Sequence, residues 1–263
     1  VLVDGEDVMQ MSSNDLMHFR RFKASMVFQK FALLPHRNVA QNAAYGLTVQ
    51  GVEEKEAVER SQRWLERVGL GGFEKHFPAQ LSGGMQQRVG LARALATDAE
   101  ILLMDEAFSA LDPLIRNDMQ SILLDLQKEL HKTIVFITHD LDEALRIGDQ
   151  ISILRDGAVI QDGDPQNIIM EPADDYIADF IKDINRGRVI KVSTLMTKAG
   201  RVSGPKFQST ALLEDALTTM SELKTDSGAV VNSAGKVIGK ITMQDAILAM
   251  ARPRREETGT RYK

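Results

Sequence analysis

The stretch Ile101-Leu102-Leu103-Met104-Asp105-Glu106 decides the fold class. Four apolar residues followed by two carboxylates predict a buried strand that ends in polar groups. Similar short runs rich in β-branched residues occur at 24–28, 133–138 and 151–154,. Between them, apolar residues recur at helical spacing at Ala57, Trp64, Leu65 and Val68, and at Ile115, Met119, Ile122, Leu126 and Leu130,. This alternation predicts an α/β fold with a mostly parallel sheet that helices cover on both sides.

Composition excludes several function classes. The 263 residues are 43% apolar and 26% charged, as in an ordinary globular protein,. With 32 basic and 37 acidic residues and no basic stripe, we expect no nucleic-acid partner,. No apolar run approaches the roughly 18 residues of a membrane-spanning helix, so we expect any membrane role to act through a partner protein. The absence of cysteine removes disulfides and thiolate metal sites,, and cytosol is the default compartment.

The strongest local motif is Leu81-Ser82-Gly83-Gly84-Met85-Gln86-Gln87-Arg88, followed by a helical pattern. Two glycines at a helix start let a phosphate approach bare amides, and the helix dipole favours an anion there. A capped helix after a loop is the alternative interpretation, and it accounts for Ser82 and one glycine but less well for Gln87 and Arg88.

Four polar side chains are expected at one edge of the sheet. Ligands of open α/β sheets gather beyond the carboxyl ends of the strands. Asp105 and Glu106 end one strand, His139 ends another, and Gln29 ends a third. One carboxylate would bind Mg²⁺ and the other would act as a base. The alternatives are a helix cap or solvated turn for the carboxylates and a structural role for the histidine.

Five motifs follow the order and spacing of ATP-binding-cassette (ABC) ATPases: Gln29, the LSGGMQQR run at 81–88, the ILLMDE run at 101–106, Ser109-Ala110-Leu111-Asp112, and Thr138-His139-Asp140. The chain resembles that family over residues 1–165. The resemblance implies a RecA-like P-loop NTPase core with a helical subdomain at about 31–92, and it implies ATP and Mg²⁺ as cofactors.

The same resemblance implies the role of each site residue. Glu106 would be the catalytic base, with His139 as the switch histidine and Gln29 as the Q-loop residue, which also belongs with Asp105 to the metal site. The nucleotide-binding residues of the signature and the D-loop would be Ser82, Gly83, Gly84, Gln86 and Asp112. In the family the signature faces an ATP held by a second ATPase subunit, so the resemblance implies a head-to-tail dimer.

The segments 28–37 and 105–116 resemble the glycine betaine and proline uptake subgroup. This resemblance implies an ATP-hydrolysing importer subunit that energises uptake of glycine betaine, proline or a related quaternary amine. The implied partners are a transmembrane permease and a periplasmic or extracellular substrate-binding protein, and the implied location is peripheral, on the cytoplasmic face of the plasma membrane. The apolar loop 31–35 either docks the membrane partner or packs on the following helices.

A domain boundary is expected near 185–190, where Asn185-Arg186-Gly187-Arg188 breaks a helical pattern,. We expect a helical linker over 166–188, a small α+β unit over 189–252, and a charged tail over 253–263. The unit should contain a helix with Leu213, Leu217, Met220 and Leu223 inward, a hairpin of strands 229–231 and 237–241, and a helix starting near Thr242. The segment 239–245 resembles the end of a CBS module, in which Thr242 and Asp245 would meet a ribose; a helix cap explains both residues equally well.

The sequence contains no G-x-x-x-x-G-K-[ST] loop, which ABC ATPases use to hold the β and γ phosphates,. The simplest expectation is an amino-terminal truncation, which would leave the 263 residues inactive alone. One alternative function is a regulatory CBS-containing binding module with an inert ABC remnant. Another is a soluble ABC ATPase of repair or translation, which the CBS-like unit disfavours.

Overall fold

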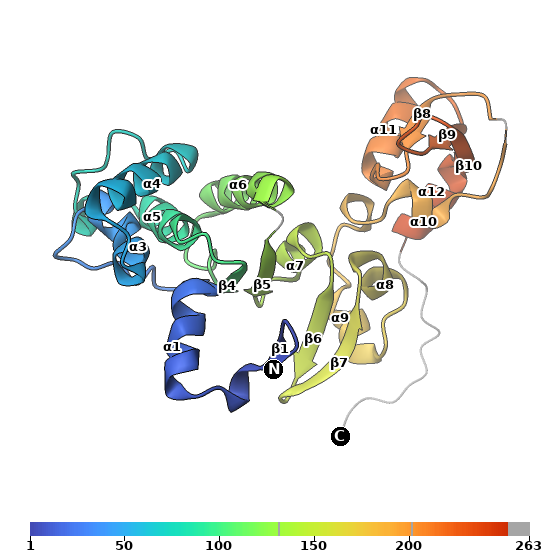
Figure 1. Ribbon diagram of the computed structural model, residues 1–263. Helices are drawn as coiled ribbons and strands as arrows, with labels where there is room; N and C mark the ends of the chain where they lie inside the picture. The colour runs from blue at the N-terminus through green and yellow to red at the C-terminus, as the bar shows by residue number, and fades with distance from the viewer. Residues whose placement is uncertain (131, 201, 252–263) are drawn as a thin grey trace. The chain divides into compact units, whose positions relative to one another are not determined.

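The computed structural model describes residues 1–130, 132–200 and 202–251 (Figure 1). The chain separates into two compact units, which divide between Glu143 and Ala144. Among the described residues, no helix is both long and apolar enough to cross a membrane.

The first unit is built on a parallel sheet of β3 (Ala24–Val27), β4 (Ile101–Asp105) and β5 (Thr133–Ile137), in that order. The central strand carries the buried Leu102 and Met104. These strands and their direction confirm the sequence prediction. The expectation that β5 is buried is wrong on one face, where Val135 is 48% and Ile137 59% exposed. Since β5 is an edge strand, alternate side chains find no cover among the described residues.

Helices and short segments complete the first unit (Figure 1): β1 (Leu2–Val3), β2 (Glu6–Asp7), η1 (Val8–Gln10), α1 (Ser13–Phe22), α2 (Val39–Ala43), α3 (Tyr45–Gln50), α4 (Glu54–Arg67), η2 (Pro78–Gln80), α5 (Gly83–Ala96) and α6 (Pro113–Leu130). α2, α3, α4 and α5 pack together. Their apolar faces meet around Leu47, Ala57 and Ala96, with Trp64 packed against them. This helical group lies in the stretch where a helical subdomain was expected.

The second unit opens with the end of α7 (Leu141–Ile147) and an antiparallel pair, β6 (Ile151–Arg155) and β7 (Ala158–Gly163). The prediction that 151–154 joins a mostly parallel sheet is therefore wrong. Asp156 and Gly157 both have positive φ, 52° and 79°, and close a tight hairpin turn,. Because the turn returns the chain at once, β7 becomes the neighbour of β6. α8 (Pro165–Met170), α9 (Asp175–Phe180) and η3 (Arg186–Arg188) follow.

The last part of the second unit is a small α+β layer (Figure 1). It contains α10 (Val192–Leu195), β8 (Lys206–Gln208), α11 (Leu213–Glu222), β9 (Ser227–Val231), β10 (Val237–Thr242) and α12 (Met243–Met250). The sheet order is β10-β9-β8, with β9 antiparallel to β10 and parallel to β8. The predicted hairpin and the helix after Thr242 are confirmed.

One core prediction in this layer is wrong. Leu213 and Met220 are fully buried, whereas Leu223 is 61% exposed. The reason is that α11 ends at Glu222, so Leu223 is the C-cap residue and lies beyond the buried face. The tail expected at 253–263 lies outside the described residues.

Candidate functional site

Glu106 stands at the carboxyl end of β4 in a left-handed backbone conformation, with φ of 41°. A non-glycine residue in this region costs on the order of 1–3 kcal/mol and persists where its surroundings fix it. Here the Glu106 N–H donates to Ile137 O at 2.9 Å, and Glu106 O accepts from Ser109 N at 3.1 Å and Oγ at 2.9 Å. The backbone therefore holds the carboxylate at a fixed place beyond the sheet.

The two carboxylate oxygens of Glu106 have different partners. Gln29 Nε2 donates to Oε2 at 2.6 Å. His139 Nδ1 lies 3.3 Å from Oε1. The Glu106 side chain is 30% exposed and the His139 side chain 69%, so the pair is open to solvent on the histidine side. The structure thus brings together Gln29, Glu106 and His139 from the ends of three neighbouring strands.

Asp105 lies beside this group, half-buried at the last position of β4 and in register with Ile137 of β5. No group of three or more histidine, cysteine, aspartate or glutamate side chains able to hold a metal occurs in the part of the chain that the structure describes. Mg²⁺ needs no such cage, since one or two carboxylates and substrate phosphates commonly bind it. Because the Gln29 amide nitrogen faces Glu106, the amide oxygen is the atom left for a cation. Asp105 and Gln29 therefore fit Mg²⁺.

The LSGG motif begins α5. Ser82 is its N-cap, and its Oγ accepts from Met85 N at 3.3 Å. Gln86 Nε2 turns back to Leu81 O at 3.3 Å. A Cβ on Gly84 would lie 2.5 Å from Ile115 Cγ2 on α6, whereas one on Gly83 would meet only Phe31 Cζ, at 3.7 Å. Capping and helix packing thus explain much of the motif, and exposed Gly83 leaves its amide open at the helix start.

Gln87 and Arg88, which helix capping does not explain, lie in different environments. Arg88 Nη1 donates to the carbonyl of Val68, the C-cap residue of α4, at 3.3 Å. Gln87 is fully buried, and neither atom of its amide group has a hydrogen-bond partner in the described residues. Arg88 therefore has a structural function in joining α5 to α4.

The apolar loop after Gln29 is anchored to the helical group. Phe31 and Ala32 have positive φ, 58° and 48°. Arg93 of α5 donates from Nη2 to Phe31 O at 3.0 Å and from Nη1 to Ala32 O at 2.6 Å. Burial lowers the pKa of Arg93 from its usual value, although a guanidinium stays charged at neutral pH. The fully buried Asn42 binds both the N–H and the carbonyl of Leu34.

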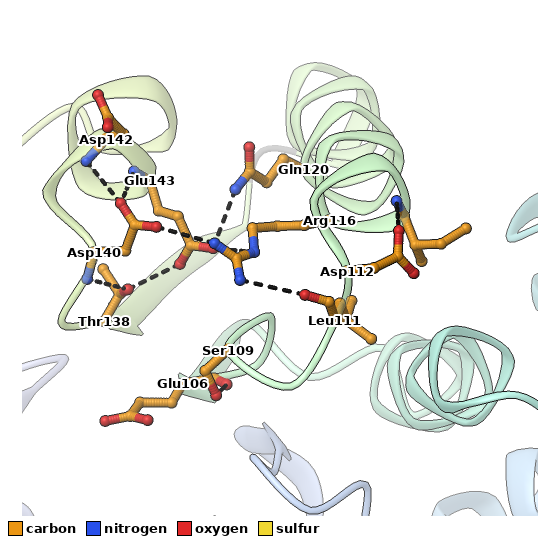
Figure 2. A network of polar contacts seen from close by, with 11 residues as sticks. Glu106, Ser109, Leu111, Asp112, Arg116, Gln120, Thr138, Asp140, Asp142 and Glu143 are labelled. Carbon is orange, nitrogen blue, oxygen red and sulfur yellow. Dashed lines mark hydrogen bonds and ion pairs between the residues drawn. The ribbon is translucent and has the colours of Figure 1, made fainter. Parts of the chain in front are cut away.

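Asp112 immediately precedes α6, and its Oδ1 accepts from Ile115 N at 3.1 Å. Sequence reasoning missed three residues that connect this segment to the histidine segment: Arg116, Gln120 and Glu143 (Figure 2). Arg116 and Glu143 each stand four residues after a motif residue, Asp112 and His139. Charged residues one turn after a motif were the signal that could have found Arg116 and Glu143.

The parallel sheet, the carboxylate with its glutamine and histidine, and the glycine-rich helix start are together the features of an α/β cassette of the ABC type. The chain belongs to the ABC transporter family. The family model described as ABC transporter matches residues 1–109. The trimethylamine N-oxide transport system ATP-binding protein of Ruegeria pomeroyi is 45% identical to this chain. The match covers 93% of this chain and 72% of that relative.

The glycine betaine transport ATP-binding protein of Bacillus subtilis is 49% identical over 94% of this chain. The chain spans 58% of that relative's length. Among solved structures, the dimeric ATP-binding cassette MJ0796 in a post-hydrolysis state with ADP and Pi is 34% identical, with a TM-score of 0.57. That match covers 62% of this chain and 72% of the solved one.

Proposed function

We propose that this chain is the ATP-hydrolysing subunit of an ABC importer for glycine betaine or a related quaternary amine. The observation that carries the ATPase function is Glu106, whose two carboxylate oxygens meet Gln29 and His139. The similarity to betaine-transport and trimethylamine N-oxide-transport ATP-binding proteins supports the solute class. Glycine betaine and trimethylamine N-oxide are both small and carry a methylated nitrogen, which a binding protein would recognise as one chemical class.

Glu106 acts as the base in the proposed reaction. Its carboxylate takes a proton from the water that attacks the γ-phosphate, and His139 orients the water and the phosphate on the exposed side. Asp105 and the Gln29 amide oxygen would hold Mg²⁺, which neutralises charge that develops on the phosphate oxygens. The Gln29 bond to Glu106 keeps the carboxylate aimed.

The signature residues Ser82, Gly83, Gly84 and Gln86, with Asp112, would serve a nucleotide held by a second ATPase subunit. A helix start with an exposed glycine amide and the positive end of the helix dipole suits an anion of this kind. The dimeric form of the 34% identical cassette supports a dimer. Hydrolysis would then need two copies arranged head to tail.

The remaining partners follow from the importer function. The membrane-spanning part would be a permease, the solute would be delivered by a periplasmic or extracellular binding protein, and this chain would lie on the cytoplasmic face of the membrane. We further propose that residues 189–252 form a CBS module. Thr242 Oγ1 accepts from Asp245 N at 3.1 Å and donates to Asp245 Oδ2 at 2.5 Å, so a helix cap accounts for these two residues.

Activity is tested with the loop-supplied chain, in which a phosphate-binding-loop segment of an ABC ATPase is joined before Val1. The 263 residues contain no such motif of their own. We expect Mg²⁺-dependent ATP turnover that membrane subunits of a betaine importer stimulate. Deleting 189–263 should keep the turnover and flatten its response to ionic strength; an unchanged salt response would refute the regulatory role of the CBS module.

A further inference from the structure

Glu143 is a buried carboxylate at the centre of a polar network (Figure 2). Its side chain is 4% exposed. Oε2 accepts from Thr138 Oγ1 at 2.8 Å, and Oε1 accepts from Gln120 Nε2 at 3.2 Å and lies 3.6 Å from Arg116 Nε. A carboxylate is retained in a buried place only when donors of this kind surround it. The donors around this buried position therefore suit a carboxylate.

The network holds both residues that flank His139. Thr138 Oγ1, besides donating to Glu143, accepts from Asp140 N at 3.0 Å. The Asp140 carboxylate accepts from Asp142 N at 3.0 Å through Oδ1 and contacts Arg116 Nη1 at 3.1 Å through Oδ2. His139 itself is mostly exposed, and the contact with Glu106 is long at 3.3 Å. The network therefore holds the chain on either side of His139.

Arg116 connects the same network to the segment before α6. Its Nη2 donates to Leu111 O at 3.2 Å, and the next residue, Asp112, caps α6. One guanidinium therefore spans two segments, because a planar fork can serve several acceptors at once. Arg116 joins the histidine segment to a helix that a predicted nucleotide-binding residue, Asp112, caps.

We propose that Glu143, through Thr138 and with Arg116, is a positioning residue for His139. It touches neither nucleotide nor water and acts by fixing the backbone of residues 138–140. This inference rests on the proposed function, since it gives His139 a part in ATP turnover. It adds two side chains, on α6 and α7, whose loss should weaken catalysis with little change in nucleotide binding.

The first test is kinetic. Thr138→Val keeps the shape of the side chain and removes the donor to Glu143; Glu143→Gln keeps the shape and removes the charge. In the loop-supplied chain we expect either change to lower kcat about ten-fold, with KM for ATP changed less than about two-fold. Thr97→Val is the matched control, because Thr97 Oγ1 donates to Ala94 O at 2.8 Å, within the end of its own helix. It should leave kcat within about two-fold.

Each change is also combined with His139→Ala, and single-turnover ATP loss is measured. A residue that acts through His139 should cost nothing further once the imidazole is gone. If the double variants lose activity by the product of the two single losses, the inference is overturned. It is also overturned if Thr138→Val or Glu143→Gln acts mainly by raising KM for ATP. If His139→Ala turns over ATP normally, the proposed role of His139 fails and the positioning role fails with it. If His139→Ala is slow but Thr138→Val is normal, only the positioning role fails.

A second test needs no turnover and uses the 263-residue chain. The ring carbon–proton signal of His139, identified by its loss in His139→Ala, is compared between variants by NMR. We expect it to move in Thr138→Val and Glu143→Gln and to stay in Thr97→Val, while the signals of the four other histidines stay in all three. An unmoved His139 signal in both network variants would contradict the proposal.

Discussion

Gln29 Nε2 donates to Glu106 Oε2 at 2.6 Å, joining two residues that are 77 positions apart in the chain. The bond crosses from the loop after β3 to the end of β4, which are neighbours in the parallel sheet. Adjacent parallel strands place their carboxyl ends at one edge, so a polar residue after each strand reaches the same space. The Gln29 amide thereby holds the proposed base at this edge of the sheet.

Glu106→Gln removes the proposed base with almost no change in shape. In the loop-supplied chain we expect turnover to fall by 10² or more, because proton transfer by a positioned side chain contributes about 10²–10⁴. ATP should remain bound and trap the proposed dimer, which size-exclusion chromatography with ATP would detect. A monomeric variant with normal turnover would refute the assignment.

Gly84→Ala should destabilise the first unit by about 1–3 kcal/mol, because the new Cβ overlaps Ile115, whose Cγ2 would lie 2.5 Å away. Gly83→Ala is the matched control, since its Cβ would meet only Phe31 Cζ at 3.7 Å. Urea unfolding followed through the single tryptophan, Trp64, measures both. Adding Ile115→Ala should recover part of the Gly84→Ala loss; equal stability of the two alanine variants would contradict this packing.

Arg93→Met should lower the free energy of unfolding by on the order of 3 kcal/mol, because two carbonyls lose a charged donor. The carbonyls belong to Phe31 and Ala32, in the left-handed turn after Gln29. Arg60→Met is the control, since Arg60 donates to one backbone carbonyl, Ala96 O. Its cost should be about 1 kcal/mol. The same tryptophan-detected unfolding applies, and equal losses would mean that Arg93 does not anchor the loop.

Leu213→Ala and Leu223→Ala test the boundary of α11. Truncating the buried Leu213 should lower the free energy of unfolding by about 2–5 kcal/mol. Truncating the exposed Leu223 should change it by less than about 0.5 kcal/mol. Amide hydrogen exchange of β9 and β10 reports the stability of this layer. Faster exchange in Leu223→Ala than in Leu213→Ala would contradict the observed burial.

Local patterns predicted much of the fold. The apolar runs at 101–104 and 133–138 became parallel strands, and the hairpin at 229–241 and the Thr242 cap appeared where the turn and cap residues indicated. Errors arose where a neighbour or a helix end decides the outcome. The pairing of 151–154 depends on the Asp156-Gly157 turn, and the exposure of Leu223 depends on where α11 stops.

The site was harder to predict beyond its motifs. Motif spacing singled out Gln29, Glu106 and His139, and strand order explains why they meet. The sequence offers no pattern for the left-handed φ of Glu106, because tertiary hydrogen bonds fix it. Glu143 was missed for a related reason: Gln120 and Arg116, which bind it, come from another helix, so only the folded chain shows that the carboxylate is buried and paired.

The most direct test of the central claim is ATP turnover by the loop-supplied chain in liposomes with the membrane subunits of a glycine betaine importer, with Glu106→Gln measured in parallel. We predict Mg²⁺-dependent turnover that rises with the membrane subunits and with externally supplied betaine and its binding protein, and that Glu106→Gln abolishes. Turnover that ignores the membrane subunits, or that survives Glu106→Gln, would contradict the account.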